Sequence, residues 1–511
     1  MKRRQFLKAA VYGFVGTAAC RLSHAQTGPA TLMVHSASKG RIVPKTFTGL
    51  SYELAQLTEP KFFSASHKDM IALFRSLSPH GLLRLGGNTS EFCWFQAEPS
   101  TPAPKLRVPP GDVQQNWMPH RLFAIQPNAI DALAGFLQTT GWSAIYGLNF
   151  GNSTPERAAA EAAYVYKTLG PRLQFFQIGN EPDFYRDANN GTRPSGWGFD
   201  DYVREWVAYA DAISAQVPAA RFGGPDTGAS SDWVTRFGQQ IAPRLGKRLV
   251  ALSGHYYAEG PPNNPKVTTA RLLAGDPTVT SSTREIVAVA DAYQLSYHMT
   301  EGNSCYRGGK PGMSNAFASS LWAGDCLLQL ASLGCGGVNL HGGDSRFVSA
   351  SLGDHNPGLE TAGGRKVAAP NGFYSPIASE QDQHAAARPV FYGMLLAQQF
   401  AGATMVASEL QCSDNVTAYA GQQGSRFLVA LFNKSDTGAV TISLRAETVV
   451  RNAEVWWLRG PALDAIDGVT LGGSSVEDNG HWLPRAERLP VSKSSVEVRL
   501  PPASGALVFL D

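Results

Sequence analysis

Between about residue 48 and residue 402, short apolar runs alternate with longer segments whose apolar residues recur at every third or fourth position. Eight short runs can be distinguished, and glycine or polar residues lie at or near the end of each. They span residues 48–54, 81–87, 143–151, 173–182, 221–227, 249–257, 295–304 and 336–343. This alternation favours a parallel sheet covered by helices, and eight repeats favour a closed (β/α)8 barrel, the TIM-barrel fold, over an open sheet.

The longer segments have the 3.6-residue period of amphipathic helices. Residues 154–170 show it most completely, with Pro155 near the start and Gly170 at the end, where these residues favour helix boundaries. The same period occurs in residues 200–218, 315–334 and 387–402. We therefore predict that the barrel occupies residues 46–402. Two longer connections, at about 92–127 and 344–386, are expected to shape a pocket or to cover the surface.

From residue 403 the pattern changes to strict alternation of apolar and polar residues between turn residues. This period of two predicts antiparallel strands packed as a small β-sandwich. The residues before the first barrel run are strand-like too, so we expect 26–45 and 403–511 to form this second domain together. The paired Trp456 and Trp457 are expected in its core or at the domain interface.

The first 25 residues resemble an export signal, with a basic start, an apolar middle and a small residue at the end. The paired Arg3 and Arg4 in "RRQFLK" resemble the twin-arginine signal of bacteria, and an ordinary secretion signal is the alternative. Cys20 fits a lipoprotein site poorly, because the usual leucine is missing. We expect a periplasmic or secreted protein without a stable membrane span, since no later apolar run reaches about 18 residues.

Composition excludes several functional classes. Hydrophobic residues make up 43% and charged residues 17% of the chain, and the net charge is +3, so no nucleic-acid partner is expected. Of the six cysteines, five lie beyond the predicted signal, and no pair has the spacing of a zinc site. No G-x-G-x-x-G motif follows the first strand, which argues against a dinucleotide-binding enzyme. We predict no metal and no organic cofactor.

Two of the predicted strands end in a glutamate. Glu181 ends the fourth run, in "FFQIGNEPDFY", and Glu301 ends the seventh, in "HMTEGNS". In a closed barrel these two strand ends face one another across the mouth, so both carboxylates would reach one bound group. A pair about 5–5.5 Å apart is the geometry of a retaining glycosidase, with one acid of raised pKa and one ionised nucleophile. The alternative is that both are ordinary solvated or salt-bridged strand ends.

Asn-Glu-Pro after strand four, together with a glutamate after strand seven, resembles clan A of the glycoside hydrolases. The resemblance implies that Glu181 is the acid/base and Glu301 the nucleophile. It also implies that Asn180 holds the 2-hydroxyl of the sugar. A tyrosine near the end of strand six commonly orients the nucleophile in this clan, which implies that role for Tyr257.

The stretch "EGNSCYRGGKPGMSNAF" is similar to the segment after the nucleophile in family 79, the β-glucuronidases and heparanases. There a tyrosine and glycine backbone amides bind the carboxylate of the uronic acid, which implies Tyr306, Gly308 and Gly309. A plain flexible turn is the alternative. "FTGLSYELAQL" resembles the first barrel strand of bacterial members and implies that Glu53 lies near the sugar hydroxyls. Arg307 departs from heparanases, which tend to have glycine there.

Other residues are weaker candidates. Arg84 and Asn88 in "RLGGN" could support the acid/base, bind a hydroxyl or simply hold the structure together. His255 and His341 lie at strand ends, where a buried and hydrogen-bonded histidine is the alternative. Three tryptophans could stack on sugar rings, and three aspartates could hold the catalytic side chains in place without touching the substrate. These are Trp94, Trp117 and Trp322, the last of which is more typical of a core position, and Asp183, Asp226 and Asp344.

The residues and the resemblance together predict a retaining, exo-acting β-glucuronidase that acts on glucuronic-acid-containing oligo- or polysaccharides or glycosides. One alternative is an endo-acting, heparanase-like enzyme, but Arg307 and the absence of an excised linker argue against cleavage of long polysaccharides. A second is another clan A activity, such as that of a xylosidase or arabinofuranosidase. A non-catalytic carbohydrate-binding protein on a decayed barrel is the most remote alternative.

Overall fold

The computed structural model describes residues 30–107, 118–186, 192–359, 371–379 and 384–511. The predicted export signal and Trp117 lie outside these residues. Within the described part of the chain, no helix is long and apolar enough to cross a membrane. All five cysteines described are free, and four of them are buried.

The eight predicted runs form a closed barrel in which every neighbouring pair of strands is parallel. The strands are β2 (Thr48–Glu53), β3 (Leu82–Gly86), β6 (Ser143–Leu148), β7 (Leu173–Ile178), β8 (Phe222–Thr227), β9 (Leu249–Glu259), β10 (Ser296–Cys305) and β11 (Gly337–Gly342). They follow one another around the barrel in chain order. The predicted TIM barrel is therefore confirmed.

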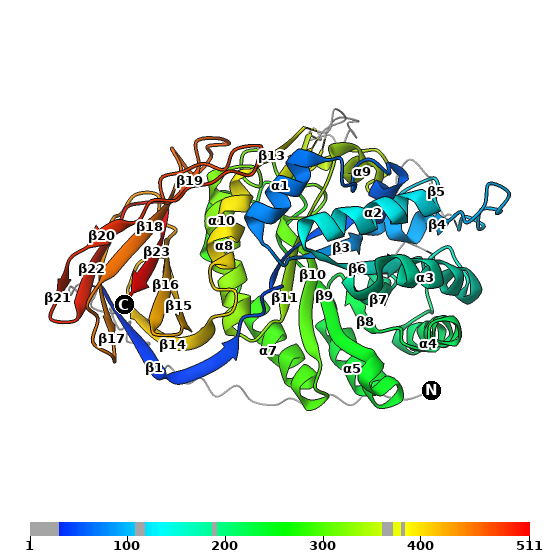
Figure 1. Cartoon of the computed structure of the whole chain (residues 1–511), viewed down its shortest axis with the longest axis horizontal. Coiled ribbons are helices and arrows are strands. Elements are labelled where there is room, and N and C mark those ends of the chain that lie inside the picture. Colours follow the sequence, from blue (N-terminus) through cyan, green and yellow to red (C-terminus); the bar gives the residue numbers. More distant parts are fainter. Residues whose placement is uncertain (1–29, 108–117, 187–191, 360–370, 380–383) are drawn as a thin grey trace, which may run out of the picture.

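Helices surround the barrel, as Figure 1 shows. They are α1 (Lys68–Leu77), α2 (Pro127–Thr140), α3 (Pro155–Leu169), α4 (Phe199–Gln216), α5 (Ser231–Leu245), α6 (Thr269–Ala274), α7 (Pro277–Ala292), α8 (Phe317–Ser332), α9 (Ser345–Ala350) and α10 (Pro389–Gln398). In α3 the side chain of Thr154 accepts a hydrogen bond from the Arg157 amide, Pro155 occupies the first turn, and Gly170 ends the helix at a φ of 52°. The boundary residues in the sequence thus act as expected.

The second domain is a mainly antiparallel β-structure that includes the N-terminal strand β1 (Ala30–Ile42). β1 lies between β14, to which it is antiparallel, and β17, to which it is parallel. The main partners are β14 (Thr404–Gln411), β15 (Val416–Gln423), β16 (Arg426–Asn433), β17 (Val440–Ala446), β18 (Ala453–Arg459), β22 (Ser495–Leu500) and β23 (Ser504–Leu510). The predicted contribution of the N-terminal segment to this domain is confirmed.

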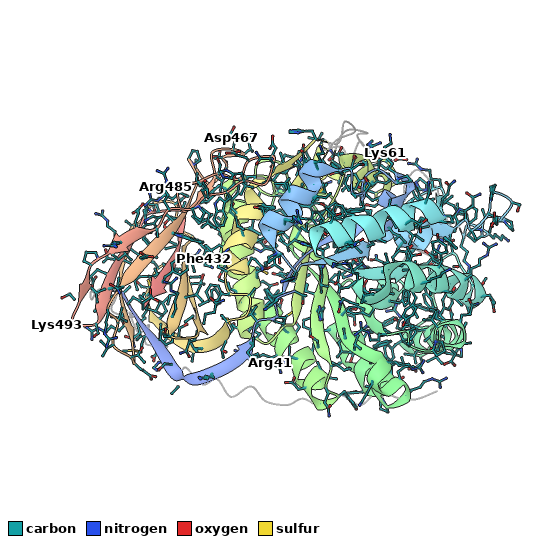
Figure 2. The ribbon with its side chains drawn as sticks, in the orientation of Figure 1. Arg41, Lys61, Phe432, Asp467, Arg485 and Lys493 are labelled. Carbon is teal, nitrogen blue, oxygen red and sulfur yellow. The ribbon has the colours of Figure 1, made fainter. Side chains whose placement is uncertain are left out.

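The two domains pack through α8 and α10 of the barrel. Phe432 of β16 lies between the sheet and these helices (Figure 2), and it contacts α8 where Gly324 leaves room for its ring. A buried ion pair of 2.6 Å between Lys434 and Asp325 ties the same surfaces together. Trp457 packs in the sandwich core, whereas Trp456 contacts Phe509 at a centroid distance of 5.0 Å. This interface fixes the sandwich against the side of the barrel.

Candidate active site

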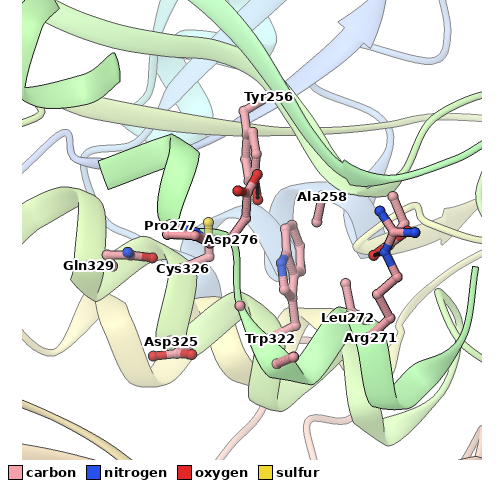
Figure 3. A pocket seen from close by; sticks show the side chains of 13 residues that line it. Tyr256, Ala258, Arg271, Leu272, Asp276, Pro277, Trp322, Asp325, Cys326 and Gln329 are labelled. Carbon is pink, nitrogen blue, oxygen red and sulfur yellow. Dashed lines mark hydrogen bonds and ion pairs between the residues drawn. The ribbon is translucent and has the colours of Figure 1, made fainter. Parts of the chain in front are cut away.

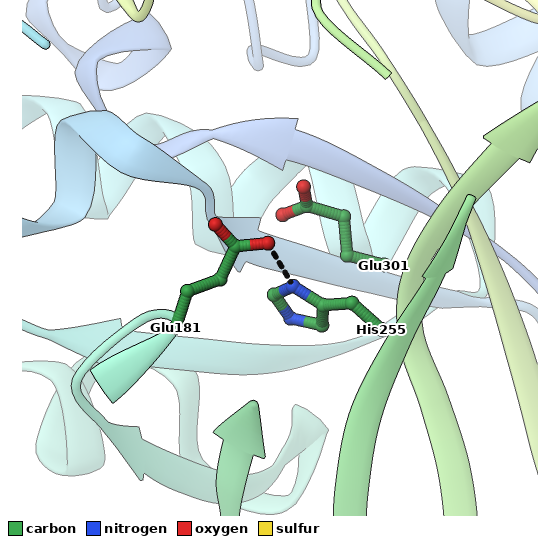
Figure 4. Close-up of side chains that lie close together, drawn as sticks. All are labelled: Glu181, His255 and Glu301. Carbon is green, nitrogen blue, oxygen red and sulfur yellow. Dashed lines mark hydrogen bonds and ion pairs between the residues drawn. The ribbon is translucent and has the colours of Figure 1, made fainter. Parts of the chain in front are cut away.

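A cavity of about 480 Å³ opens at the carboxyl ends of the barrel strands, and both glutamates line it. One carboxylate oxygen of Glu181 lies within 4.8 Å of one of Glu301, and Figure 4 shows the two side chains close together, with His255 beside them. An inverting glycosidase needs about 6.5–9.5 Å between its carboxyl groups, so this spacing favours a retaining reaction. The lining residues are Glu53, Asn88, Met118, Glu181, Phe184, Gly228, Ala229, Tyr257, Glu301, Tyr306, Arg307, His341, Ser351, Leu352 and Tyr374.

The backbone around Glu181 is held in an uncommon conformation. Glu181 has a φ of 51° and a ψ of 51°, in the left-handed region that a side chain seldom adopts. Its amide donates to the Asp226 carbonyl at 2.9 Å, and the Asn180 amide donates to the buried Glu91 carboxylate at 2.8 Å. These contacts turn the chain sharply after β7 and point the Glu181 carboxylate into the cavity.

Glu301 is surrounded by hydrogen-bond donors. Arg84 donates to Oε2 at 2.6 Å, Tyr257 donates to Oε1 at 2.7 Å, and the ring of His341 lies 3.7 Å from Oε2. Burial alone would raise the pKa of Glu301, but the nearby His341, His255 and Arg84 lower that pKa to about 2. The carboxylate is therefore ionised at any working pH, as a nucleophile must be.

Glu181 has a different environment. Burial raises the pKa of its carboxyl, the negative charges of Glu301 and Asp183 add to that effect, and the hydrogen bond from His255 opposes it. The Nδ1 atom of His255 lies 3.0 Å from Oε1 of Glu181. Two carboxyl groups in one cavity thus have pKa values moved in opposite directions, which is how an acid and a nucleophile are separated.

A buried chain of charges connects the two glutamates. His255 lies between Glu181 and Asp226, Asp226 pairs with Arg84, and Arg84 pairs with Glu301. The Nε2 atom of His255 lies 3.2 Å from Asp226 but is poorly aligned for a hydrogen bond, so the attraction is mainly that of an ion pair. Burial lowers the pKa of His255, but Asp226 and Glu301 raise it to about 10. His255 is therefore an imidazolium held between carboxylates.

A second group of side chains lies next to Glu301. The Glu53 carboxylate accepts hydrogen bonds from the amide and hydroxyl of Thr89, at 2.9 and 2.7 Å. Its other oxygen lies 3.3 Å from His341, whose Nδ1 atom contacts the Ser51 hydroxyl at 2.9 Å. Tyr374 stacks on Tyr257 at a centroid distance of 6.3 Å. Fixed acceptors beside aromatic faces suit a sugar ring with hydroxyl groups.

Of the three residues that the resemblance implies for binding the uronic acid carboxylate, only one lines the cavity. Tyr306 and Arg307 line the cavity, whereas Gly308 and Gly309 are not among the lining residues. Gly308 has a φ of 86° and Gly309 a φ of 87°, in the left-handed region that favours glycine. A side chain at Gly308 would also collide with Asn371. Among the described residues, the Tyr306 hydroxyl has no hydrogen-bond partner, so it is available to a ligand.

The two asparagines also differ. Asn88 lines the cavity, and its amide nitrogen lies 3.3 Å from the Ser351 carbonyl. Asn180 is buried beneath it, and its side-chain oxygen accepts a hydrogen bond of 2.8 Å from Arg84. Arg84 contacts Glu301 and Asp226 rather than the Glu181 side chain.

Several lining residues were not singled out from the sequence. They are Met118, Phe184, Gly228, Ala229, Ser351, Leu352 and Tyr374. Three of these belong to the connection 344–386, which the sequence indicated only as a long segment that could shape the pocket. Asp226 was a weak candidate, and its signal was a polar residue near the end of the predicted fifth strand.

Glu181, His255 and Glu301 form the one group in the described chain whose atoms are close enough to hold a metal ion. Their proximity is accounted for without an ion, because His255 lies between the carboxylates of Glu181 and Asp226 in the buried chain of charges. The same three groups are suited to proton transfer and to nucleophilic attack.

A separate cavity of about 300 Å³ lies outside the barrel, between β9, the α6–α7 segment and α8 (Figure 3). Neither Glu181 nor Glu301 lines it. Asp276 there accepts hydrogen bonds from Thr278 at the start of α7, and Asp325 pairs with Lys434 across the domain interface. Trp322 is 5% exposed, as expected for a core residue. These groups have structural partners, so we assign the chemistry to the barrel mouth.

Comparison with known proteins supports the sequence resemblance. No family model matches the chain. A β-glucuronidase of Aspergillus niger is 25% identical over 312 residues, which cover 57% of this chain and 55% of that protein. Heparanase of Gallus gallus is 22% identical over 356 residues, covering 58% and 65%. The chain therefore matches about half the length of the β-glucuronidase and slightly less than two thirds of the heparanase.

Solved structures extend the likeness to nearly the whole chain. A 4-O-α-L-rhamnosyl-β-D-glucuronidase from Fusarium oxysporum superposes with a TM-score of 0.72 at 17% identity, over 93% of this chain and 99% of that one. A family 51 arabinofuranosidase from Xanthomonas axonopodis gives a TM-score of 0.64 at 18% identity, over 94% and 100%. At these identities the likeness concerns the fold. The resemblance of this chain to the β-glucuronidases and heparanases is thus confirmed by sequence relatives and is consistent with the shared barrel-and-sandwich fold.

Proposed function

We propose that the protein is a retaining β-glucuronidase that releases β-linked glucuronic acid from glycans or glycosides. The observation that carries this proposal is the pair Glu181 and Glu301, which share one cavity within 4.8 Å and have pKa values moved in opposite directions. The names of the relatives supply the substrate class, and the site supplies the chemistry.

The reaction would take two steps. In the first, a Glu301 oxygen attacks the anomeric carbon, the bond to the leaving oxygen breaks, and Glu181 transfers its proton to that oxygen. In the second, ionised Glu181 removes a proton from water, the water oxygen bonds to the anomeric carbon, and Glu301 leaves as a carboxylate. Glu181 is protonated again at the end, so the cycle closes without a cofactor.

Recognition of the uronic acid is assigned to Tyr306 and its neighbours. Tyr306 and Arg307 both line the cavity, and no residue in the described ranges forms a hydrogen bond with the Tyr306 hydroxyl. A hydroxyl donor and a guanidinium both suit a carboxylate. Gly308 and Gly309 remain proposed amide donors. They do not line the cavity, so the carboxylate would have to pass Tyr306 to reach their amides. Glu53, Asn180 and Asn88 are proposed to hold or position sugar hydroxyls.

An exo mode of cleavage is favoured by the contact between Asn88 and Ser351. It joins the segments after β3 and β11 on one side of the mouth, which limits how far a chain can extend there. An endo-acting enzyme needs an open cleft on both sides. We further propose that the protein is exported, on the basis of its twin-arginine-like start.

The test compares hydrolysis of 4-nitrophenyl β-glucuronide, β-glucoside and β-xyloside by the purified protein. A β-glucuronidase should prefer the glucuronide by orders of magnitude, and nuclear magnetic resonance should show the β-anomer as the first product. Glu301→Gln should abolish turnover while the protein stays folded. Preference for the xyloside would instead support the xylosidase or arabinofuranosidase alternative, and binding without hydrolysis would support a carbohydrate-binding protein. Product sizing on a glucuronoxylan, an arabinogalactan glycan and heparan sulfate would separate exo from endo cleavage.

A further inference from the structure

The loop after β8 is fastened to the turn that carries Glu181 by one side chain, Asp183. Its Oδ1 atom accepts a hydrogen bond of 2.8 Å from the Gly228 amide. Its Oδ2 atom accepts two more, from the amides of Ala229 at 2.9 Å and Ser230 at 3.0 Å. Three backbone donors on one carboxylate form a strong and directional clamp between the two loops.

The clamped loop touches the catalytic acid directly. A side chain at Gly228 would lie 2.3 Å from the Phe184 ring and 2.9 Å from the carboxyl group of Glu181, so only glycine fits there. Phe184, Gly228 and Ala229 all line the cavity beside Glu181. Any shift of the loop would therefore change the space around the acid.

This wall must face the leaving group if Glu181 is the acid/base. The acid has to reach the glycosidic oxygen, so groups packed on its cavity side contact whatever is attached to that oxygen. Phe184, Gly228 and Ala229 bring no charge to this wall. A leaving group with an apolar ring face, either a sugar or an aryl group, fits it better than a charged one.

We propose that Asp183 is a positioning residue: it holds residues 228–230 against Glu181 and, with Phe184, shapes the leaving-group side of the cavity. The inference rests on the proposed glucuronidase function. Burial is the main reason for the raised pKa of Glu181, and the negative charge of Asp183 adds to it. Both effects favour proton donation to the leaving oxygen.

The test compares kcat/KM, which reports the glycosylation step, for phenyl and 2,4-dinitrophenyl β-glucuronide. The dinitrophenolate leaves without protonation, so only the phenyl substrate needs a correctly placed acid. Asp183→Ala should lower kcat/KM about 100-fold for the phenyl substrate and less than about 5-fold for the dinitrophenyl substrate. Asp183→Asn keeps one acceptor oxygen, which can serve Ala229 and Ser230, and should recover part of the loss.

The matched control is Asp201→Ala, which removes an aspartate that accepts the Gly198 amide at 3.1 Å at the start of α4, away from the cavity. It should change neither substrate. Phe184→Ala should raise KM for phenyl more than for methyl β-glucuronide. Equal losses on both aryl substrates for Asp183→Ala would overturn the inference while leaving the glucuronidase intact. A wild-type protein inactive on both substrates would overturn the proposed function itself and this inference with it.

Discussion

Arg84 and Glu301 form a buried ion pair of 2.6 Å between residues that lie 217 positions apart in the chain. Arg84 is 1% exposed and reaches Asp226 with its other terminal nitrogen, so one guanidinium bridges the carboxylates of Glu301 and Asp226. A planar fork with two separate donors is needed for this arrangement. The pair links the ionisation of Glu301 to the charges around Glu181.

Replacing Arg84 should therefore raise the pKa of Glu301 and weaken the enzyme at low pH. Arg84→Lys keeps a charge but cannot bridge both carboxylates, and we expect kcat/KM to fall about 100-fold. The acidic limb of the pH profile should move to higher pH, because the nucleophile must lose its proton first. Arg121→Lys is the matched control, since Arg121 forms an exposed pair with Asp354 at 3.1 Å. An acidic limb that stays in place in Arg84→Lys would contradict the assigned role.

His255 should shift both limbs of the pH profile in the same direction. Its positive charge lowers the pKa of Glu181 and that of Glu301. In His255→Gln both pKa values should rise, so the bell-shaped profile of kcat/KM against pH should move to higher pH by about one unit. His298→Gln serves as the control: burial lowers the pKa of His298 to about 4, so this ring is neutral at the working pH. Limbs that move in opposite directions in His255→Gln would contradict the charge chain.

The barrel and its two glutamates were predictable because each depends on local pattern. An apolar run with a polar end predicts a barrel strand whose carboxyl end lies at the mouth, where sites form in this fold. Strands four and seven face one another once the barrel closes. The export segment lies outside the described residues, so its role stays a prediction.

The supporting groups were harder to predict because they depend on geometry that one run of residues does not contain. Asp226 has a left-handed backbone, with a φ of 63°, which its sequence neighbours do not reveal. Glu91 accepts hydrogen bonds from the amides of Phe150, Gly151 and Asn180, which lie far from it in the sequence. Tyr374 reaches the cavity from a long connection with no periodic pattern. Gly308 and Gly309 were implied by resemblance, and their packing against Asn371 and Tyr374 could not be read from "YRGG".

Tyr306 should determine the preference for a charged sugar. Tyr306 lines the cavity, and its hydroxyl has no partner among the described residues, so Tyr306→Phe removes a donor without disturbing a described protein contact. We expect kcat/KM to fall about 10- to 100-fold on 4-nitrophenyl β-glucuronide. Hydrolysis of the matching β-xyloside, which lacks the carboxylate, should stay within about 3-fold. Tyr256→Phe is the control, since that hydroxyl lies outside the mouth, 3.3 Å from Asp276. Equal losses on both substrates would argue against carboxylate recognition by Tyr306.

Glu161 should make stability depend on pH independently of catalysis. This carboxyl lies on α3, is 4% exposed and accepts a hydrogen bond of 2.9 Å from Tyr146. Burial raises its pKa from 4.5 to about 7. Between these two values the unfolded chain has lost the proton and the folded chain still holds it. The free energy of unfolding should therefore fall as the pH rises through this window, by up to about 3 kcal/mol.

Glu161→Gln keeps an acceptor for Tyr146 and cannot ionise, so it should remove this loss. Urea unfolding should show the variant and the wild type nearly equal at pH 4 and the variant more stable at pH 8. Glu156→Gln on the same helix is the control: the pKa of that exposed group is lowered by its backbone and Thr154 hydrogen bonds, so its small effect should have the opposite pH trend. If the stability difference between Glu161→Gln and the wild type is the same at both pH values, Glu161 is not protonated in the folded protein, because only a proton retained on folding makes that difference depend on pH.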